Sequence, residues 1–172
     1  ENYHQPEMPE GVEEGILKGI YELDNVKAKK KAKGDVQLLG SGTILQQVRK
    51  AADILAEDYD INSTVYSVTS FNELARDGLD TDRWNMLHPE KKEKEAYITQ
   101  VMKKAKGPAV AATDYVKLYA DQVRAWVPTS YRVLGTDGYG RSDSRANLRK
   151  HFEIDPQYIV VAALKELADQ GD

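Results

Sequence analysis

The sequence of 172 residues contains no cysteine, which excludes disulfide bonds, thiolate metal ligands and thiol nucleophiles. It has only three histidines, His4, His88 and His151, and they lie far apart. None of them stands in an HExxH or HxxxH pattern, so a histidine metal site has little support. No serine stands in a GxSxG pattern, which leaves a hydrolase triad equally without support.

Long apolar runs are missing, and so is a strong excess of charge of either sign. No stretch approaches the roughly 20 apolar residues that a membrane-spanning helix needs. The net charge of −4 gives no general attraction to nucleic acid or to an anionic membrane. With 41% hydrophobic and 30% charged residues, the composition is typical of a globular domain. We therefore expect neither nucleic acid nor a membrane among its partners.

The first residues give no sign of regular structure. The chain begins with Glu1 rather than an initiator methionine, and no basic-then-apolar signal pattern follows. Residues 1–15 contain Pro6 and Pro9, several acids and no periodicity, which predicts an interdomain linker or arm. Residues 16–172 are then expected to form one α/β domain, and the whole chain is expected to be part of a longer protein.

From residue 19 onward, short apolar runs alternate with segments of helical period. The runs predict strands at residues 19–23, 36–39, 64–68, 108–112 and 131–134. Strands separated by helices run parallel, whereas the first strand reaches the second through a loop and should lie antiparallel at an edge. The sequence therefore predicts a three-layer α/β/α sandwich with a mostly parallel sheet of about five strands. Val110 and Leu134 are expected to be buried in central strands.

Capping signals predict where several helices begin. Ser70 and Glu73 form a capping box, and Asp155 followed by Pro156 gives an N-cap and an N1 proline. Asp114 is expected to cap another helix. The helix residues expected to face the core are Ile44, Val48, Ala52 and Leu55; Phe71, Leu74, Trp84 and Leu87; Val116, Tyr119, Ala120, Val123 and Val127; and Ile159, Val160, Ala163, Leu164 and Leu167.

Three features invite a binding interpretation but are better explained structurally. The basic run of residues 27–33 (KAKKKAK) has no interleaved aromatic residue, which favours a solvated hairpin loop over a nucleic-acid patch. Residues 40–42 (GSG) lie between a strand and a helix N-terminus, where a phosphate can bind. They lack GxGxxG spacing and a P-loop lysine, which favours a tight turn. His88, before Pro89, is interpreted as a helix-end residue that contacts carbonyl groups.

The most distinctive stretch is residues 131–152, whose pattern predicts a strand, a loop and a helix. The loop, residues 135–145, begins at Gly135, is punctuated by further glycines and carries charges of alternating sign. Ser142 or Ser144 can cap the following helix. Loops at the carboxyl ends of parallel strands are where open α/β sheets place ligand and partner contacts. The residues singled out as a candidate interface or active-site approach are Asp137, Tyr139, Arg141, Ser142, Asp143 and Arg145.

The residues alone leave the role of this charged loop open, because no complete set of catalytic residues accompanies it. One hypothesis is that Arg141 and Arg145 pair with acids of another domain or subunit. A second is a local Asp–Arg network that only makes the loop rigid and caps the helix. A third is a stand-alone α/β module that binds an anionic small molecule through residues 135–145.

Four segments resemble a known family. They are VQLLGSGTILQQV (36–48), VYSVTSFNELARDG (65–78), RWNMLHP (83–89) and GTDGYGRSDSRANLRKHFEID (135–155). With the opening ENYHQPEMPEG, they resemble the C-terminal domain of homodimeric bacterial pyruvate dehydrogenase E1 components, which are related to transketolase. The resemblance covers essentially the whole chain. It departs from the family where Tyr139 replaces the usual phenylalanine, in the more charged residues 91–95, and where the chain stops before the family's C-terminal tail.

The resemblance implies a cytoplasmic parent enzyme that depends on thiamine diphosphate and Mg²⁺. Such a parent decarboxylates pyruvate and reductively acetylates the lipoyl group of the E2 component. The family holds its cofactor with a GDG…NN motif, and neither part occurs here, since Thr136-Asp137-Gly138 is not that motif. We therefore expect no catalytic, cofactor-binding or metal-binding residue in this chain.

The resemblance also implies who the partners are. They would be the remaining domains of the same E1 chain, the second E1 subunit of the homodimer, and the E2 acetyltransferase component of the complex. The domain itself would support dimerisation and shape the approach to the active site, and a vestigial regulatory ligand site is a further possibility.

Overall fold

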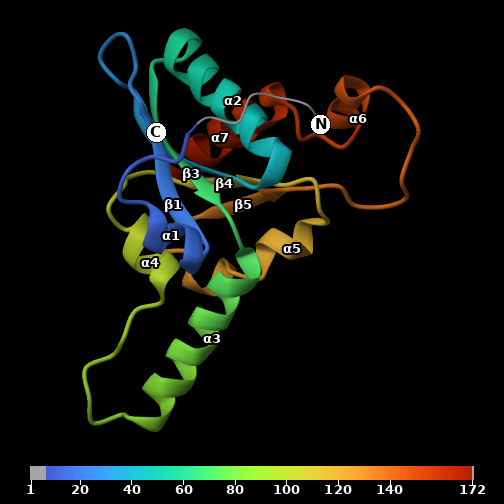
Figure 1. The fold of residues 1–172 in the computed structure, drawn as a ribbon. Coiled ribbons are helices and arrows are strands. Elements are labelled where there is room, and N and C mark those ends of the chain that lie inside the picture. Colours follow the sequence, from blue (N-terminus) through green and yellow to red (C-terminus); the bar gives the residue numbers. More distant parts are fainter. Residues whose placement is uncertain (1–6, 172) are drawn as a thin grey trace.

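The computed structural model describes residues 7–171 (Figure 1). Its strands are β1 (Ile20–Val26), β2 (Gly34–Gly40), β3 (Ile61–Val68), β4 (Ala109–Ala112) and β5 (Tyr131–Leu134). Its α-helices are α1 (Glu13–Lys18), α2 (Leu45–Asp58), α3 (Phe71–Leu87), α4 (Tyr97–Met102), α5 (Lys117–Asp121), α6 (Arg145–His151) and α7 (Pro156–Gln170). Short 3₁₀ helices cover Gly42–Ile44 and Arg124–Trp126.

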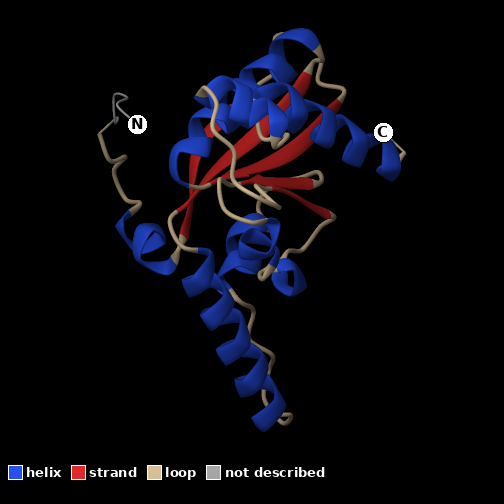
Figure 2. Ribbon diagram, turned by 90° about the vertical axis from the view of Figure 1, so that its right-hand side faces the viewer, coloured by secondary structure: helices blue, strands red, loops and turns tan. Residues whose placement is uncertain are grey.

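The strands form one five-stranded sheet in the order β1-β3-β2-β4-β5. Strands β2, β3, β4 and β5 pair in parallel, while β1 pairs antiparallel with β3 at one edge. Helices cover both faces of the sheet (Figure 2). The predicted α/β/α sandwich with an antiparallel edge strand is therefore confirmed. One detail was wrong: β1 pairs with β3 and not with β2, so residues 27–33 cross to the next strand instead of closing a hairpin.

Two hydrophobic clusters form the core, one on each face of the sheet. Leu38 of β2 belongs to the cluster under α2 and α7, and its neighbour Leu39 belongs to the cluster with α3, α4 and α5. Both side chains are fully buried, because successive strand residues point to opposite faces of a sheet that is covered on both sides. Figure 1 shows α2 and α7 above the strands and α3, α4 and α5 below them.

The predicted capping signals at Ser70 and Asp155 are confirmed. The Ser70 hydroxyl accepts a hydrogen bond from the Glu73 amide (3.1 Å), and an Asp155 carboxylate oxygen accepts one from the Tyr158 amide (2.9 Å). Both bonds satisfy an amide that has no partner within its own helix. The core faces expected for α2 and α7 are also confirmed, with Leu164 only partly buried.

Part of the stretch expected to be a linker is helical. Helix α1 has Glu13 and Glu14 in its first turn, where acids are favoured, and Lys18 in its last turn pairs with Glu14 at 2.6 Å. It ends at Gly19, whose φ of 103° is readily adopted by glycine. Residues 7–12 form no helix or strand, and residues 1–6 of the expected linker lie outside the described residues. The boundary at residue 16 stays a prediction.

The helix expected after Asp114 is shorter and begins later. Its N-cap is Val116, which is 51% exposed, so the predictions of an Asp114 cap and of an inward-facing Val116 were wrong. The reason lies in the neighbouring loop. Thr136 donates its hydroxyl to the Asp114 carbonyl (2.6 Å) and its amide to the Tyr115 carbonyl (2.8 Å), which ties residues 114–115 to that loop instead of to a helix.

Three burial predictions were also wrong. Trp84 is only partly buried and stacks on His88 instead of joining the core. Leu87 is 54% exposed, because the end of α3 extends beyond the sheet. Leu134 is only partly buried, since β5 lies at the edge of the sheet and has a neighbour on one side alone. Val110, in the interior strand β4, is buried as predicted.

Candidate functional site

The charged loop, residues 135–145, leaves the carboxyl end of β5 and leads to α6. Its first residues are fixed to the chain that follows β4. A Cβ on Gly135 would lie 2.7 Å from the Tyr115 carbonyl oxygen, so only glycine allows the two backbones to approach this closely. The two Thr136 hydrogen bonds described above continue this contact. The start of the loop is therefore a rigid part of the domain.

Asp137 holds the start of α5. One of its carboxylate oxygens accepts a hydrogen bond from the Lys117 amide (2.9 Å), and the other lies 3.8 Å from the Lys117 ammonium. Helix α5 has no side-chain cap from the residue before it, so an acid from a separate segment satisfies its first amide. The charge of Asp137 therefore has a local structural use.

Asp143 and Ser144 hold the start of α6. The Ser144 hydroxyl accepts a hydrogen bond from the Asn147 amide (3.3 Å), which answers the choice left open between Ser142 and Ser144. The Asp143 carboxylate accepts one hydrogen bond from the Asn147 side chain (2.8 Å) and one from the Ser144 amide (2.6 Å). These two donors favour the charged carboxylate and lower the pKa of Asp143.

The tip of the loop points away from the domain. Tyr139 is 96% exposed, and a Cβ on Gly138 or Gly140 would meet no atom within 4 Å. Arg141 is exposed and makes no hydrogen bond or ion pair with any residue in the described part of the chain. Arg145, the first residue of α6, is also exposed, but it does have an interaction partner. The loop thus presents an aromatic ring and a guanidinium to its surroundings.

Exposed apolar side chains lie beside this loop, and the sequence reasoning did not anticipate them. Val116 is joined there by Tyr115 and by Leu118, which is 74% exposed. No signal in the sequence distinguished them, because positions 115, 118 and 119 have the i, i+3, i+4 spacing of one helix face. The surface around the charged loop is therefore both apolar and charged, as is common at protein interfaces.

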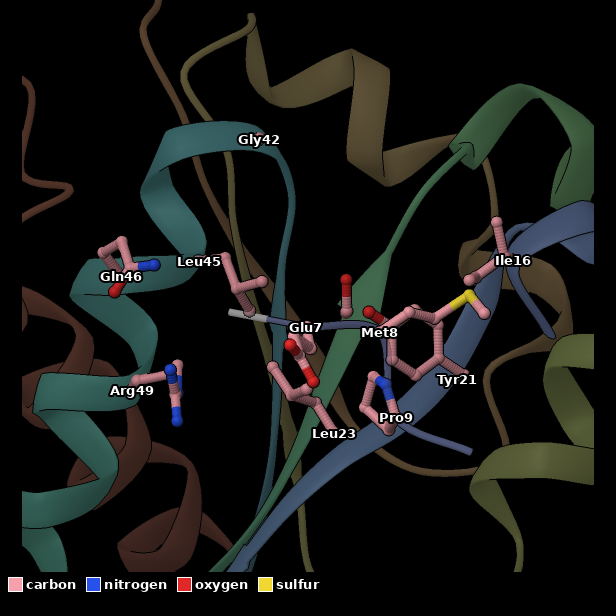
Figure 3. Close-up of a pocket in the computed structure, with 11 residues that line it drawn as sticks. Glu7, Met8, Pro9, Ile16, Tyr21, Leu23, Gly42, Leu45, Gln46 and Arg49 are labelled. Carbon is pink, nitrogen blue, oxygen red and sulfur yellow. The ribbon is translucent and has the colours of Figure 1, made fainter. Parts of the chain in front are cut away.

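A cavity of about 300 Å³ lies between the N-terminal segment, β1 and the start of α2 (Figure 3). Met8, Pro9, Tyr21 and Leu23 give it a largely apolar lining. Its basic residue is Arg49, whose guanidinium already pairs with Asp24 at 2.7 Å. An anionic ligand would have to compete with that carboxylate, so the cavity gives little support to an anion-binding module.

A second cavity of about 180 Å³ lies between α6 and the segment after β4. Thr136 and Arg145 of the charged loop line it, together with Arg149 and with Asp114, whose negative charge offsets one of the two positive ones. Residues 137–144 line neither this cavity nor the one in Figure 3. A small-molecule site built from the loop tip therefore lacks an enclosing surface in either place.

The features interpreted as structural have partners within the domain. In the GSG turn (residues 40–42), the Ser41 hydroxyl bonds the Thr113 hydroxyl at 2.9 Å, in a buried position. In the basic run, Lys29 pairs with Glu57 at 2.7 Å and Lys33 with Asp60 at 3.1 Å. The predicted contact of His88 with a helix-end carbonyl is confirmed, with Nδ1 lying 2.8 Å from the Trp84 oxygen.

Residues 7–171 contain no group of three or more histidines, aspartates or glutamates placed to hold a metal ion. A metal centre built wholly from such side chains therefore does not fit this part of the chain. The same residues include no helix that is both long and apolar enough to cross a bilayer.

The sheet order and the covered faces define an α/β/α domain with a mostly parallel five-stranded sheet. Comparison with known sequences gives the family: the pattern described as "Transketolase-like TK C-terminal domain" matches residues 19–155. The chain belongs to this transketolase-like C-terminal domain family.

Individual relatives agree with this assignment. The pyruvate dehydrogenase E1 component of Escherichia coli K12 is 65% identical over 173 residues, covering 100% of this chain and 19% of that protein. The transketolase of Leishmania mexicana has a similar fold, with a TM-score of 0.56, 18% identity, and coverage of 92% of this chain and 19% of that one. A split-gene transketolase has a similar fold, and its structure is described as an inactive "beta4 tetramer", which does not refer to strand β4. It matches with a TM-score of 0.52 and 14% identity over 84% of this chain and 42% of its own.

Proposed function

We propose that this chain is the C-terminal domain of a cytoplasmic pyruvate dehydrogenase E1 component. The observation that supports this most strongly is the 65% identity with the Escherichia coli E1 component, which extends over the entire chain. The parent would use thiamine diphosphate and Mg²⁺ to decarboxylate pyruvate and to acetylate the lipoyl group of E2. In the parent, that cofactor would supply carbanion chemistry and would be held by residues of other domains.

None of that chemistry is assigned to residues of this chain. Neither the GDG nor the NN part of the family's cofactor motif occurs in this chain. Its described residues also contain no group of three or more histidines, aspartates or glutamates placed to hold a metal ion. These points support a domain that contributes to the assembly of the parent while the reaction takes place on other domains.

Calorimetry with thiamine diphosphate and Mg²⁺ tests this division of labour. We expect no binding tighter than about 1 mM to the isolated chain, which corresponds to roughly −4 kcal/mol. The full-length parent under the same conditions is the control and should bind the cofactor and turn over pyruvate. Micromolar binding by the isolated chain, or a parent without pyruvate decarboxylation, would contradict the proposal.

The domain's own contribution to the parent is proposed to be a contact made by the charged loop. Asp137 and Asp143 already accept hydrogen bonds from α5 and α6, whereas Arg141 has no partner among the described residues. A local network that used all the loop's charges would leave no exposed guanidinium of this kind. Because arginine pairs with carboxylates in a bidentate geometry, we infer that Arg141, together with Arg145, meets acids of another domain or of the second subunit.

The variant Arg141→Ala tests this role, with Lys106→Ala as a matched control. Both residues are exposed and basic, but Lys106 precedes β4 and so lies at the opposite edge of the sheet. We expect neither change to shift the melting temperature of the isolated chain, since exposed charges contribute little. In the full-length parent, Arg141→Ala alone should weaken dimerisation or turnover. Equal behaviour of the two variants in the parent would rule out the interface role.

A further inference from the structure

Helix α3 consists of two halves with different surroundings. Its first half packs on the sheet through Phe71, Leu74 and Gly78, and Trp126 lies so close that a Cβ on Gly78 would sit 2.3 Å from its ring. The Trp126 indole also donates to the Asp82 carboxylate at 3.0 Å. Beyond Gly78, no residue of α3 is buried. Figures 1 and 2 both show this second half extending away from the body of the domain.

The second half of α3 and the segment that returns from it, residues 88–96, form what we call the α3 arm, residues 79–96. The return segment is fixed to one side of the helix. Asn85 exchanges two hydrogen bonds with the backbone of Lys94 (3.0 and 2.9 Å), and the Lys94 ammonium lies 3.8 Å above the Trp84 ring. The His88 ring stacks on Trp84 at 4.5 Å. The arm is therefore ordered by its own contacts.

The opposite side of the arm carries exposed apolar side chains, with Asp82 and Arg83 between them. Leu79 is 62% exposed and Met86 is 69% exposed, and a spacing of seven residues places them on one side of the helix. Leu87 is exposed beside them. Arg83 stands between Leu79 and Met86, is itself exposed, and makes no ion pair with any residue from 7 to 171. Long apolar side chains gathered on an ordered projection are unfavourable in water unless something covers them.

We propose that this side of the α3 arm, made by Leu79, Arg83, Met86 and Leu87, is a docking surface for another domain of the same parent protein. The partner surface would be apolar and would place a carboxylate opposite Arg83. This inference rests on the proposed function.

The choice of occupant follows from how much of the parent lies outside this chain. The chain covers only 19% of the Escherichia coli relative, so most of such a protein is available to cover the arm. Two further properties of the arm fit an interface within one protein. It is held by its own contacts in the isolated chain, and its exposed side combines apolar groups with an arginine, a residue type that protein interfaces favour.

The lack of cysteine makes a direct test possible, because Met86→Cys introduces the only thiol in this chain. The alkylation rate at position 86 is measured by peptide mass spectrometry, in the isolated chain and in the full-length parent. We expect the parent to react at least on the order of tenfold more slowly, because a covered side chain reacts only when the contact opens. Lys31→Cys, in the exposed basic run at the other end of the molecule, is the control and should react equally in both.

Equal rates at position 86 in the chain and in the parent would overturn the proposal. So would protection that appears only when E2 is added, which would assign the arm to E2, or protection in the isolated chain at high concentration, which would assign it to a second copy. The labelling needs no turnover, so a parent without pyruvate decarboxylation would refute the proposed function and still report whether the arm is covered. Met86→Lys should lower the melting temperature of the parent and leave that of the isolated chain unchanged.

Discussion

Two strand-to-helix loops at the carboxyl edge of the sheet both contain glycine and serine but have opposite roles. The GSG turn after β2 is enclosed: Ser41 is buried, and a Cβ on Gly40 would lie 2.8 Å from the Leu45 Cα. The charged loop after β5 is open, with Tyr139 almost fully exposed and free space around Gly140. The glycines of the first loop allow close packing, whereas those of the second allow the chain to leave the surface.

The difference follows from the position of each strand in the sheet. Strand β2 has neighbours on both sides, so the loop that follows it is closed in by the chain after β4. Strand β5 lies at the edge, so only the beginning of its loop meets another segment. A partner outside the domain can therefore reach the loop after β5 and not the turn after β2, which is why the functional proposal concerns the former.

The largest difference between the two loops is expected when one methyl group is added to each of them. Gly40→Ala should destabilise the domain by about 1–3 kcal/mol, because the new Cβ collides with the backbone of Leu45. Gly140→Ala should change the free energy of unfolding by no more than about 0.5 kcal/mol, since no atom lies near the added methyl group. Urea melts of both variants give the two values. Similar losses in the two variants would mean that the loops do not differ in packing.

A smaller effect is expected from the hydroxyl groups of the two loops. Ser41→Ala removes the buried hydrogen bond to Thr113 and should cost about 1 kcal/mol. The matched change Ser142→Ala affects an exposed residue that does not cap α6, so it should have little effect on stability. Thermal melts of the two variants can be compared directly. If the two serines contribute equally, the turn after β2 is more open than its geometry indicates.

The sequence predicts those features that depend on neighbours along the chain. The capping residues Ser70 and Asp155 were predicted because an N-cap and the amide it satisfies are only a few residues apart. Apolar runs and their alternation with helices were local signals as well. From these the class of fold followed, since alternating strands and helices allow few arrangements.

Features that depend on the order of the strands were not predictable in this way. Val110 and Leu134 both stand in short apolar runs, yet only the former is in an interior strand. The exposure of Val116 depends on Thr136, which is distant in sequence and holds the preceding residues out of the helix. For the charged loop, the residues could be identified from the sequence. Only the structure showed that Asp137 and Asp143 have local partners, whereas Arg141 has none among the described residues.

The smallest effect concerns the titration of the charged loop. The pKa of Asp143 lies below its ordinary value of 3.8, first because the Asn147 side chain donates a hydrogen bond to the carboxylate, and second because the Ser144 amide does. A carboxyl group whose pKa is lower in the folded chain favours folding when it is ionised. Its contribution is therefore present above the unfolded pKa and is lost as the pH falls through the folded pKa.

An NMR titration of the Asp143 carboxyl carbon measures this shift. In Asn147→Ala, the larger cause is removed while the Ser144 donor remains, so the pKa of Asp143 should rise part of the way toward its ordinary value. The backbone amide at position 147 still bonds Ser144 in that variant, so the cap of α6 is kept. The change in stability should be too small to detect by melting, since the group is fully exposed. An ordinary pKa in the unmodified chain would show that the Asp143 carboxylate does not accept these hydrogen bonds at the start of α6. Asp143 could then pair with a partner protein instead.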